Sequence, residues 1–266
     1  MAEKENKEEH NEEKQEDKKL FTITTQNIWK ITTVVLAIIV VLLLVQNAKY
    51  KNEAQGETVP QTEETDEADA VDMALYDDDV VKGSDDAPVT VIIYSDPSCP
   101  YCAAAAGGEK MVAYMNQRSP GYEPAVPGIM ENYVETGKVK LVFRYFPGHG
   151  KGVEAMKMLL CANEQDKFWE LHDIFFDNQD LMEAGDTEGL ATLAKDVVPD
   201  TAAFDSCVET NTYQTKMDAD YKRGIAAATS AQTQMGTPAF VINGKLITGA
   251  QPYSTFASVI DAALAE

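Results

Sequence analysis

The sequence predicts an α/β fold, a mixed sheet with an inserted helical subdomain, preceded by one transmembrane helix. Three observations support this prediction: an unbroken apolar run near the N-terminus, short β-branched strands farther along, and several amphipathic helical stretches between those strands. The chain has 266 residues, of which 44% are hydrophobic. It is therefore long enough for one large or two small domains, part of which can bury a core.

The chain is acidic, with a formal net charge of -22. This charge argues against nucleic-acid binding, which requires a basic surface. Residues 52–80 contain eleven carboxylates and no Lys or Arg, and the first twenty residues are almost all charged or amide. Neither stretch has enough apolar surface to offset the entropy of ordering. We therefore predict a disordered charged tail at 1–27 and a flexible acidic linker at 47–80.

Residues 28–45 form the apolar run, and no polar residue occurs at 34–45. Eighteen helical residues span about 27 Å, close to the thickness of the hydrocarbon layer. The flanks are too polar to surround a buried core helix, and the run is long for a cleaved signal peptide. We predict a transmembrane anchor at 28–46. Its flanking lysines are nearly balanced, so they do not decide the orientation.

The globular domain is predicted to cover residues 81–266. Residues 89–94 and 138–145 are rich in β-branched and apolar side chains, which is typical of buried strands. Two short strands at 239–242 and 245–248 flank Asn243-Gly244, a strong hairpin signal. Apolar residues at helical spacing predict helices at about 155–161, 168–176, 190–197, 212–229 and 252–265. The helical insertion is expected at about 150–230.

Cys99-Pro100-Tyr101-Cys102 follows the first strand and opens a helix. With Cys99 as the N-cap, Pro100 occupies the first helical position, where a missing N–H has no cost. The free N–H groups of the first turn and the helix dipole favour a thiolate, so the pKa of Cys99 should fall. A low pKa stabilises the reduced form and makes the disulfide oxidising, with Cys102 as the resolving thiol.

A zinc site is the main alternative for a pair with this spacing. Structural zinc usually requires two such pairs, whereas Cys161 and Cys207 are single and the three histidines are not at ligand spacing. An inert structural disulfide is a further alternative, although a strand followed by C-x-x-C and a helix is typical of redox sites. We therefore expect a redox-active pair, with no metal and no cofactor.

Four segments resemble the DsbA-like thiol:disulfide oxidoreductase family, and they follow one another in the same order: residues 83–102, 137–147, 161–172 and 236–244. The resemblance extends from about Gly83 to the C-terminus. It implies a thioredoxin fold with a helical insertion and catalytic roles for Cys99 and Cys102. One difference is extra material at 103–127, about fifteen residues beyond an ordinary connection. This insertion could shape substrate binding or could be a neutral surface excursion.

The resemblance also implies that Pro238 is cis and lies beside the cysteine pair. The backbone of Thr237 would then be free to pair with a substrate peptide. From the residues alone, an ordinary trans proline at the start of a strand would be preferred. Asp96 could relay protons to Cys102, but an Asp-Pro turn before a helix is the favoured interpretation.

Cys161 and Cys207 lie on apolar faces of the predicted insertion. Free buried thiols are possible, but an oxidising compartment favours a structural disulfide, and related sequences often have this bridge. Closing the loop would contribute about 4 kcal/mol. An electron relay to the active site is a lesser possibility.

A thiol oxidase belongs outside the cytosol. We therefore expect the catalytic domain on the extracytoplasmic side of a bacterial membrane, with the N-terminus inside.

Three functions remain open at this point. The first is an oxidase that donates its disulfide to cysteine-containing secreted proteins and is reoxidised by a membrane redox partner. The second is an isomerase or reductase that a membrane partner keeps reduced. The third is a non-catalytic peptide-binding module, which the intact cysteine pair and Pro238 argue against. The dipeptide Pro100-Tyr101 does not decide between the first two.

Overall fold

The structure is a computed structural model that describes residues 36, 41–42 and 70–266. The chain divides into two units, Met1–Thr65 and Asp66–Glu266, and the first contains only three described residues. The predicted tail and most of the predicted anchor and linker lie outside the described residues. Within the described part, no helix has the length and apolar character needed to cross a membrane.

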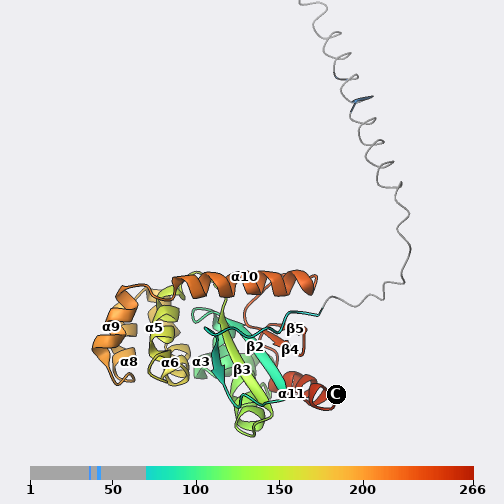
Figure 1. The fold of residues 1–266 in the computed structure, drawn as a ribbon, viewed down its shortest axis with the longest axis horizontal. Coiled ribbons are helices and arrows are strands. Elements are labelled where there is room, and N and C mark those ends of the chain that lie inside the picture. The colour runs from blue at the N-terminus through green and yellow to red at the C-terminus, as the bar shows by residue number, and fades with distance from the viewer. Residues whose placement is uncertain (1–35, 37–40, 43–69) are drawn as a thin grey trace, which may run out of the picture. The chain divides into compact units, whose positions relative to one another are not determined.

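The second unit is built on a five-stranded mixed sheet with the order β1-β3-β2-β4-β5 (Figure 1). β2 and β3 are parallel, and the other neighbouring pairs are antiparallel. The predicted mixed sheet is therefore confirmed. The strands are β1 Val80–Lys82, β2 Val89–Ser95, β3 Val139–Tyr145, β4 Ala239–Ile242 and β5 Lys245–Thr248.

Helices cover both faces of the sheet. Ile92 and Tyr94 of β2 pack on the side that carries α10, whereas Val91 and Ile93 face α11 and its neighbours. Burial on both faces explains why β2 is a nearly continuous run of apolar residues. The helices on the α11 side are α2 Pro100–Ala106, α4 Ala125–Ile129, the π-helix η1 Met130–Val134 and α11 Tyr253–Leu264.

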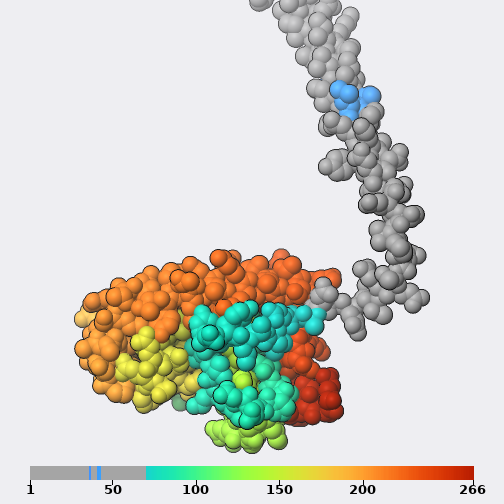
Figure 2. All heavy atoms as spheres, in the orientation of Figure 1, coloured from blue at the N-terminus to red at the C-terminus, as the bar shows by residue number. Residues whose placement is uncertain are grey.

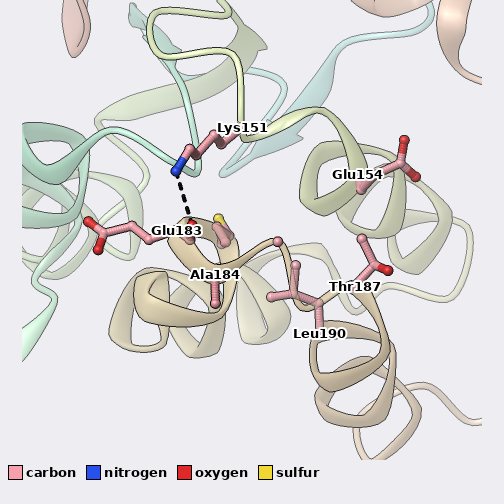
Figure 3. A pocket seen from close by; sticks show the side chains of 8 residues that line it. Lys151, Glu154, Glu183, Ala184, Thr187 and Leu190 are labelled. Atoms are coloured by element: carbon pink, nitrogen blue, oxygen red, sulfur yellow. Dashed lines mark hydrogen bonds between the residues drawn. The ribbon is translucent and has the colours of Figure 1, made fainter.

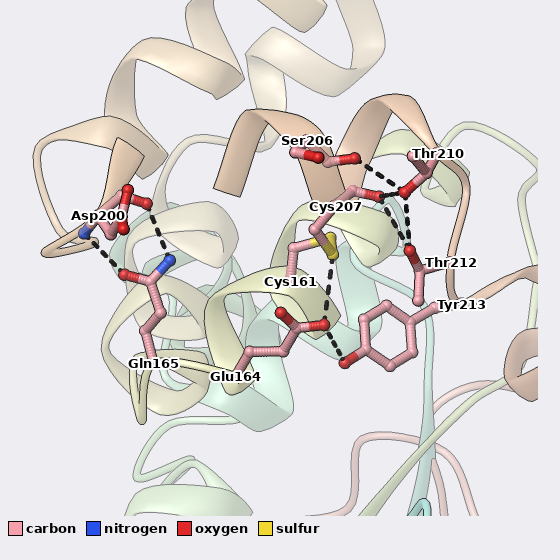
Figure 4. Close-up of a disulfide and its surroundings, with 9 residues drawn as sticks. All are labelled: Cys161, Glu164, Gln165, Asp200, Ser206, Cys207, Thr210, Thr212 and Tyr213. Atoms are coloured by element: carbon pink, nitrogen blue, oxygen red, sulfur yellow. Dashed lines mark hydrogen bonds between the residues drawn. A yellow bond between two sulfur atoms is a disulfide. The ribbon is translucent and has the colours of Figure 1, made fainter. Parts of the chain in front are cut away.

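The predicted helical insertion is also confirmed, and it forms a core of its own next to the end of β3. Its helices are α5 Val153–Asn163, α6 Phe168–Asp177, α7 Gln179–Ala184, α8 Thr187–Lys195, α9 Thr201–Glu209 and α10 Gln214–Ser230. Cys161 of α5 and Cys207 of α9 form a disulfide with a Cα–Cα distance of 5.8 Å (Figure 4). This bond joins two helices at the end of the insertion.

Residues 70–80, placed in the flexible linker by the sequence pattern, pack against the domain. Val71 is buried, and its N–H donates to the carbonyl of Gly244 at 2.9 Å. Asp79 forms a fully buried ion pair with Arg144 of β3, at 2.8 Å. The many carboxylates of this segment suggested a solvent-exposed linker. The buried partner of Asp79 could not be recognised from the sequence, because Arg144 lies far along the chain. In Figure 2 the turquoise start of the domain lies against the orange α10, whose Arg223 stacks on Tyr76.

The extra residues at 103–127 add a helix, α3 Glu109–Arg118, between α2 and α4. α3 has no fully buried residue, yet it is attached to the helical insertion. The N–H of Glu109 donates to Asp177 Oδ1 at 2.9 Å. Gly108 lies so close to the carbonyl of Phe176 that a Cβ atom there would be 2.8 Å from its oxygen. The inserted helix is therefore seated at the corner between α6 and α7.

Candidate active site

The two active-site cysteines lie where the parallel strands end. β2 finishes at Ser95, a short turn follows, and Cys99 is the N-cap residue of α2 with Pro100 in its first turn. Both Cys99 and Cys102 are free thiols. This is the arrangement that the sequence predicts.

The two thiols differ strongly in acidity. The pKa of Cys99 is lowered to about 6, and hydrogen bonding from the Cys102 side chain is the largest cause, opposed by burial, which raises the pKa. Thr237, the backbone N–H of Cys102 and the charge of His149 make smaller contributions to this lowering. The pKa of Cys102 is raised well above its usual range, because the thiol is buried and lies next to Cys99. Near neutral pH, Cys99 is therefore the thiolate and Cys102 the proton donor.

Both cysteines are covered in this conformation. Cys99 has 0% and Cys102 1% of its surface exposed, whereas Tyr101 between them is 46% exposed. Phe176 belongs to the same apolar cluster as both cysteines and Met111 packs against that cluster, so the helical insertion and the extra helix α3 both contribute to it. A substrate can reach Cys99 Sγ only after a local movement uncovers it.

The peptide bond between Thr237 and Pro238 is cis, and it lies beside the cysteines. Cys99 Sγ lies 3.4 Å from the carbonyl oxygen of Thr237, to which the protonated thiol donates a hydrogen bond. Gly148 approaches the other side of Thr237, where an added Cβ would lie 2.5 Å from Oγ1. Thr237 and Pro238 therefore occupy the position that the family resemblance implies, next to the reactive sulfur.

Asp96 is completely buried, and three donors satisfy its carboxylate. Oδ1 accepts from the N–H of Ser98 at 2.9 Å and from its hydroxyl at 2.8 Å. Oδ2 accepts from the N–H of His149 at 2.8 Å. The backbone N–H of Asp96, rather than its carboxylate, contacts Cys102, and it lies 3.5 Å from Cys102 Sγ. This geometry favours a structural role, in which Asp96 holds the turn before α2 and the loop after β3, over a proton relay.

Two residues near the cysteines were missed as site residues. Gln179 of α7 donates to the carbonyl oxygens of Pro97 and Cys99, and His149 follows the glycine that touches Thr237. No sequence signal marked Gln179, because it lies 80 residues from Cys99. His149 is one of the three histidines that lack metal-ligand spacing, and no other sequence pattern marks it. The described residues contain no group of three or more His, Cys, Asp or Glu placed to hold a metal.

A sequence model of the family described as thioredoxin matches residues 76–262. The chain belongs to the thioredoxin family. Disulfide bond formation protein D of Bacillus subtilis is 27% identical over 192 residues, which cover 68% of this chain and 75% of that protein. The crystal structure of oxidised BdbD from Bacillus subtilis superimposes with a TM-score of 0.54 at 22% identity, covering 71% of this chain and 94% of that one. The resemblance to DsbA-like proteins is therefore confirmed.

A relative of a different kind matches over only a small part of its own length. The Na(+)/H(+) antiporter NhaA 3 of Salinispora tropica is 29% identical over 172 residues, or 64% of this chain. The match spans only 22% of the antiporter's own length.

Proposed function

We propose that this member of the thioredoxin family is a thiol:disulfide oxidoreductase that oxidises cysteine pairs of secreted proteins through Cys99 and Cys102. The observation that carries the proposal is the pairing of an acidic thiol at a helix N-terminus, Cys99, with a protonated resolving thiol, Cys102. Stabilising the Cys99 thiolate stabilises the reduced protein, which makes its disulfide an oxidant. The name of the Bacillus subtilis relative, disulfide bond formation protein D, agrees with this direction.

The reaction begins with the Cys99–Cys102 disulfide. A substrate thiolate attacks Cys99 Sγ, the Cys99–Cys102 bond breaks, and Cys102 leaves and takes up a proton. A second substrate thiolate attacks the substrate sulfur of the mixed disulfide, and Cys99 leaves as a thiolate. The substrate gains a disulfide, and two electrons remain on Cys99 and Cys102. A membrane redox partner with a disulfide or quinone acceptor must then remove these electrons.

The proposed location is the outer side of a bacterial cell membrane, with residues 28–46 as a single anchor. The apolar run supports the anchor, and the Cys161–Cys207 disulfide is compatible with an oxidising compartment. Protease treatment of spheroplasts tests the orientation. Digestion of the C-terminal domain is expected, and complete protection would contradict the proposal.

The reduction potential of the full-length protein, equilibrated against glutathione, tests the direction of the reaction. A value near -120 mV, as for DsbA, supports an oxidase, whereas a value near -270 mV, as for thioredoxin, supports a reductase kept reduced by its partner. The variant Cys99→Ser should lose all disulfide exchange. Retained biological activity in that variant would favour a non-catalytic peptide-binding module.

A further inference from the structure

The helical insertion contributes one polar side chain directly to the turn that carries the reactive cysteine. Gln179 Nε2 donates to the carbonyl oxygen of Pro97 at 2.6 Å and to that of Cys99 at 2.9 Å. We propose that Gln179 is a positioning residue of the redox site, which holds this turn so that the Cys99 thiolate keeps its stabilising neighbours.

The turn is held from two sides. On one side, the Asp96 carboxylate accepts hydrogen bonds from the N–H and the hydroxyl of Ser98. On the other side, Gln179 donates to the carbonyls of Pro97 and Cys99, which flank Ser98. The carbonyl of Cys99 also accepts the first helical hydrogen bond of α2, from Ala103. The orientation of the Cys99 peptide therefore depends on one donor from its own helix and one from the insertion.

Gln179 is itself held in place, because contacts fix both ends of α7. At its start, the side chain of Asn178 donates to the carbonyl of Ile174 at 2.8 Å. Near its end, Lys151 Nζ donates to the carbonyl of Glu183 at 3.0 Å, beside a cavity of about 280 Å³ (Figure 3). Lys151 belongs to the loop that Asp96 binds through His149. Both ends of α7 are thus joined to segments next to the cysteines.

The chemical consequence follows from the dipoles at the turn. The carbonyl oxygens of Pro97 and Cys99 carry partial negative charge and belong to the same turn as a sulfur that must also carry negative charge. The two amide protons of Gln179 Nε2 offset these oxygens. They also fix the N-cap geometry, on which the hydrogen bond from Cys102 to Cys99 depends. Without Gln179, the thiolate should be less stable and the disulfide less oxidising.

The test compares two glutamines of the same insertion in the full-length protein. Gln165 also bridges backbone groups, since it donates to the carbonyl of Asp200 and accepts from its N–H (Figure 4). Gln165→Leu therefore removes a comparable pair of hydrogen bonds away from the cysteines. Gln179→Leu should lower the acid dissociation constant of Cys99 three- to tenfold, and Gln165→Leu should leave it unchanged. The redox equilibrium constant should move by the same factor, about 15 to 30 mV toward reducing values.

Further variants keep the test decisive. Gln179→Glu has the same shape but adds an oxygen anion facing the two carbonyls, so its shift should exceed that of Gln179→Leu. Gln179→Asn keeps the amide but is too short to reach both carbonyls, and it replaces the leucine variant if that protein does not fold. An unchanged Cys99 pKa in these variants, or an equal shift in Gln165→Leu, would overturn the proposal. The pKa measurement is independent of whether the protein acts as an oxidase or a reductase.

Discussion

The resolving cysteine controls the acidity of its partner, and two substitutions at Cys102 separate its hydrogen bond from its other effects. Hydrogen bonding from Cys102 is the largest influence on the Cys99 pKa. Cys102→Ser keeps a donor at this position, whereas Cys102→Ala removes it. A hydrogen bond to a charged group contributes about 1.5 to 3 kcal/mol, and one pKa unit corresponds to about 1.36 kcal/mol. The Cys99 pKa should therefore rise by about one to two units in Cys102→Ala.

The same change alters the pH dependence of stability. In the reduced protein the folded-state pKa of Cys99, about 6, lies below its unfolded value of about 8.5. The thiolate therefore contributes stability that is complete above about pH 8.5 and is lost as the pH falls through about 6. At pH 7 about nine-tenths of Cys99 is ionised, and a pKa of about 8 would reduce this to about one-tenth.

The assay is an ultraviolet titration of the thiolate in the two variants, in which Cys99 is the only free cysteine. Iodoacetamide alkylation rates as a function of pH give an independent value. A Cys102→Ala protein that titrates together with Cys102→Ser would refute the hydrogen-bond explanation. A wild-type midpoint in the ordinary thiol range would refute the assignment of Cys99 as an acidic thiol.

Three further predictions concern the surrounding structure. Asp79→Asn leaves the buried charge of Arg144 unpaired, so urea denaturation should show a loss of about 3 to 5 kcal/mol; an unchanged midpoint would mean that residues 70–80 do not pack as described. Removing Cys161 and Cys207 together as serines opens a loop of 46 residues, with an expected loss of about 4 kcal/mol, whereas free thiols in mass mapping of the oxidised protein would contradict the bridge. His149→Ala should raise the Cys99 pKa by less than about one unit, and more at low than at high salt; equal values at both salt concentrations would exclude a charge effect.

The acid stability of the Asp79 ion pair can be stated with its sign. Burial raises the pKa of Asp79, but the hydrogen bonds from Arg144 and the N–H of Tyr76, with the positive charges nearby, lower it overall. Its contribution is therefore present above the unfolded carboxyl value of about 3.9 and is lost as the pH falls further. This dependence should be absent from Asp79→Asn, which provides an internal control for the denaturation series.

Local sequence patterns were sufficient for the elements that depend on local forces. The β-branched runs at 89–94 and 138–145 became the paired central strands, and Asn243-Gly244 became the turn of the hairpin. Pro100 after Cys99 marked the start of α2, because proline fits the first helical position and almost no other. The helices α3, α7 and α9 were not predicted as separate helices from the sequence.

By itself, therefore, the sequence determined the α/β class, the helical insertion and the position of the reactive cysteine pair at a helix start. These features depend on the side-chain period, on turn residues and on the spacing of neighbours along the chain. Only the tertiary structure decided that residues 70–80 join the domain, that Asp96 accepts a hydrogen bond from the backbone N–H of His149, and that Gln179 reaches the turn before α2. Each of these depends on hydrogen bonds or ion pairs between distant residues, and such contacts leave no period in the sequence.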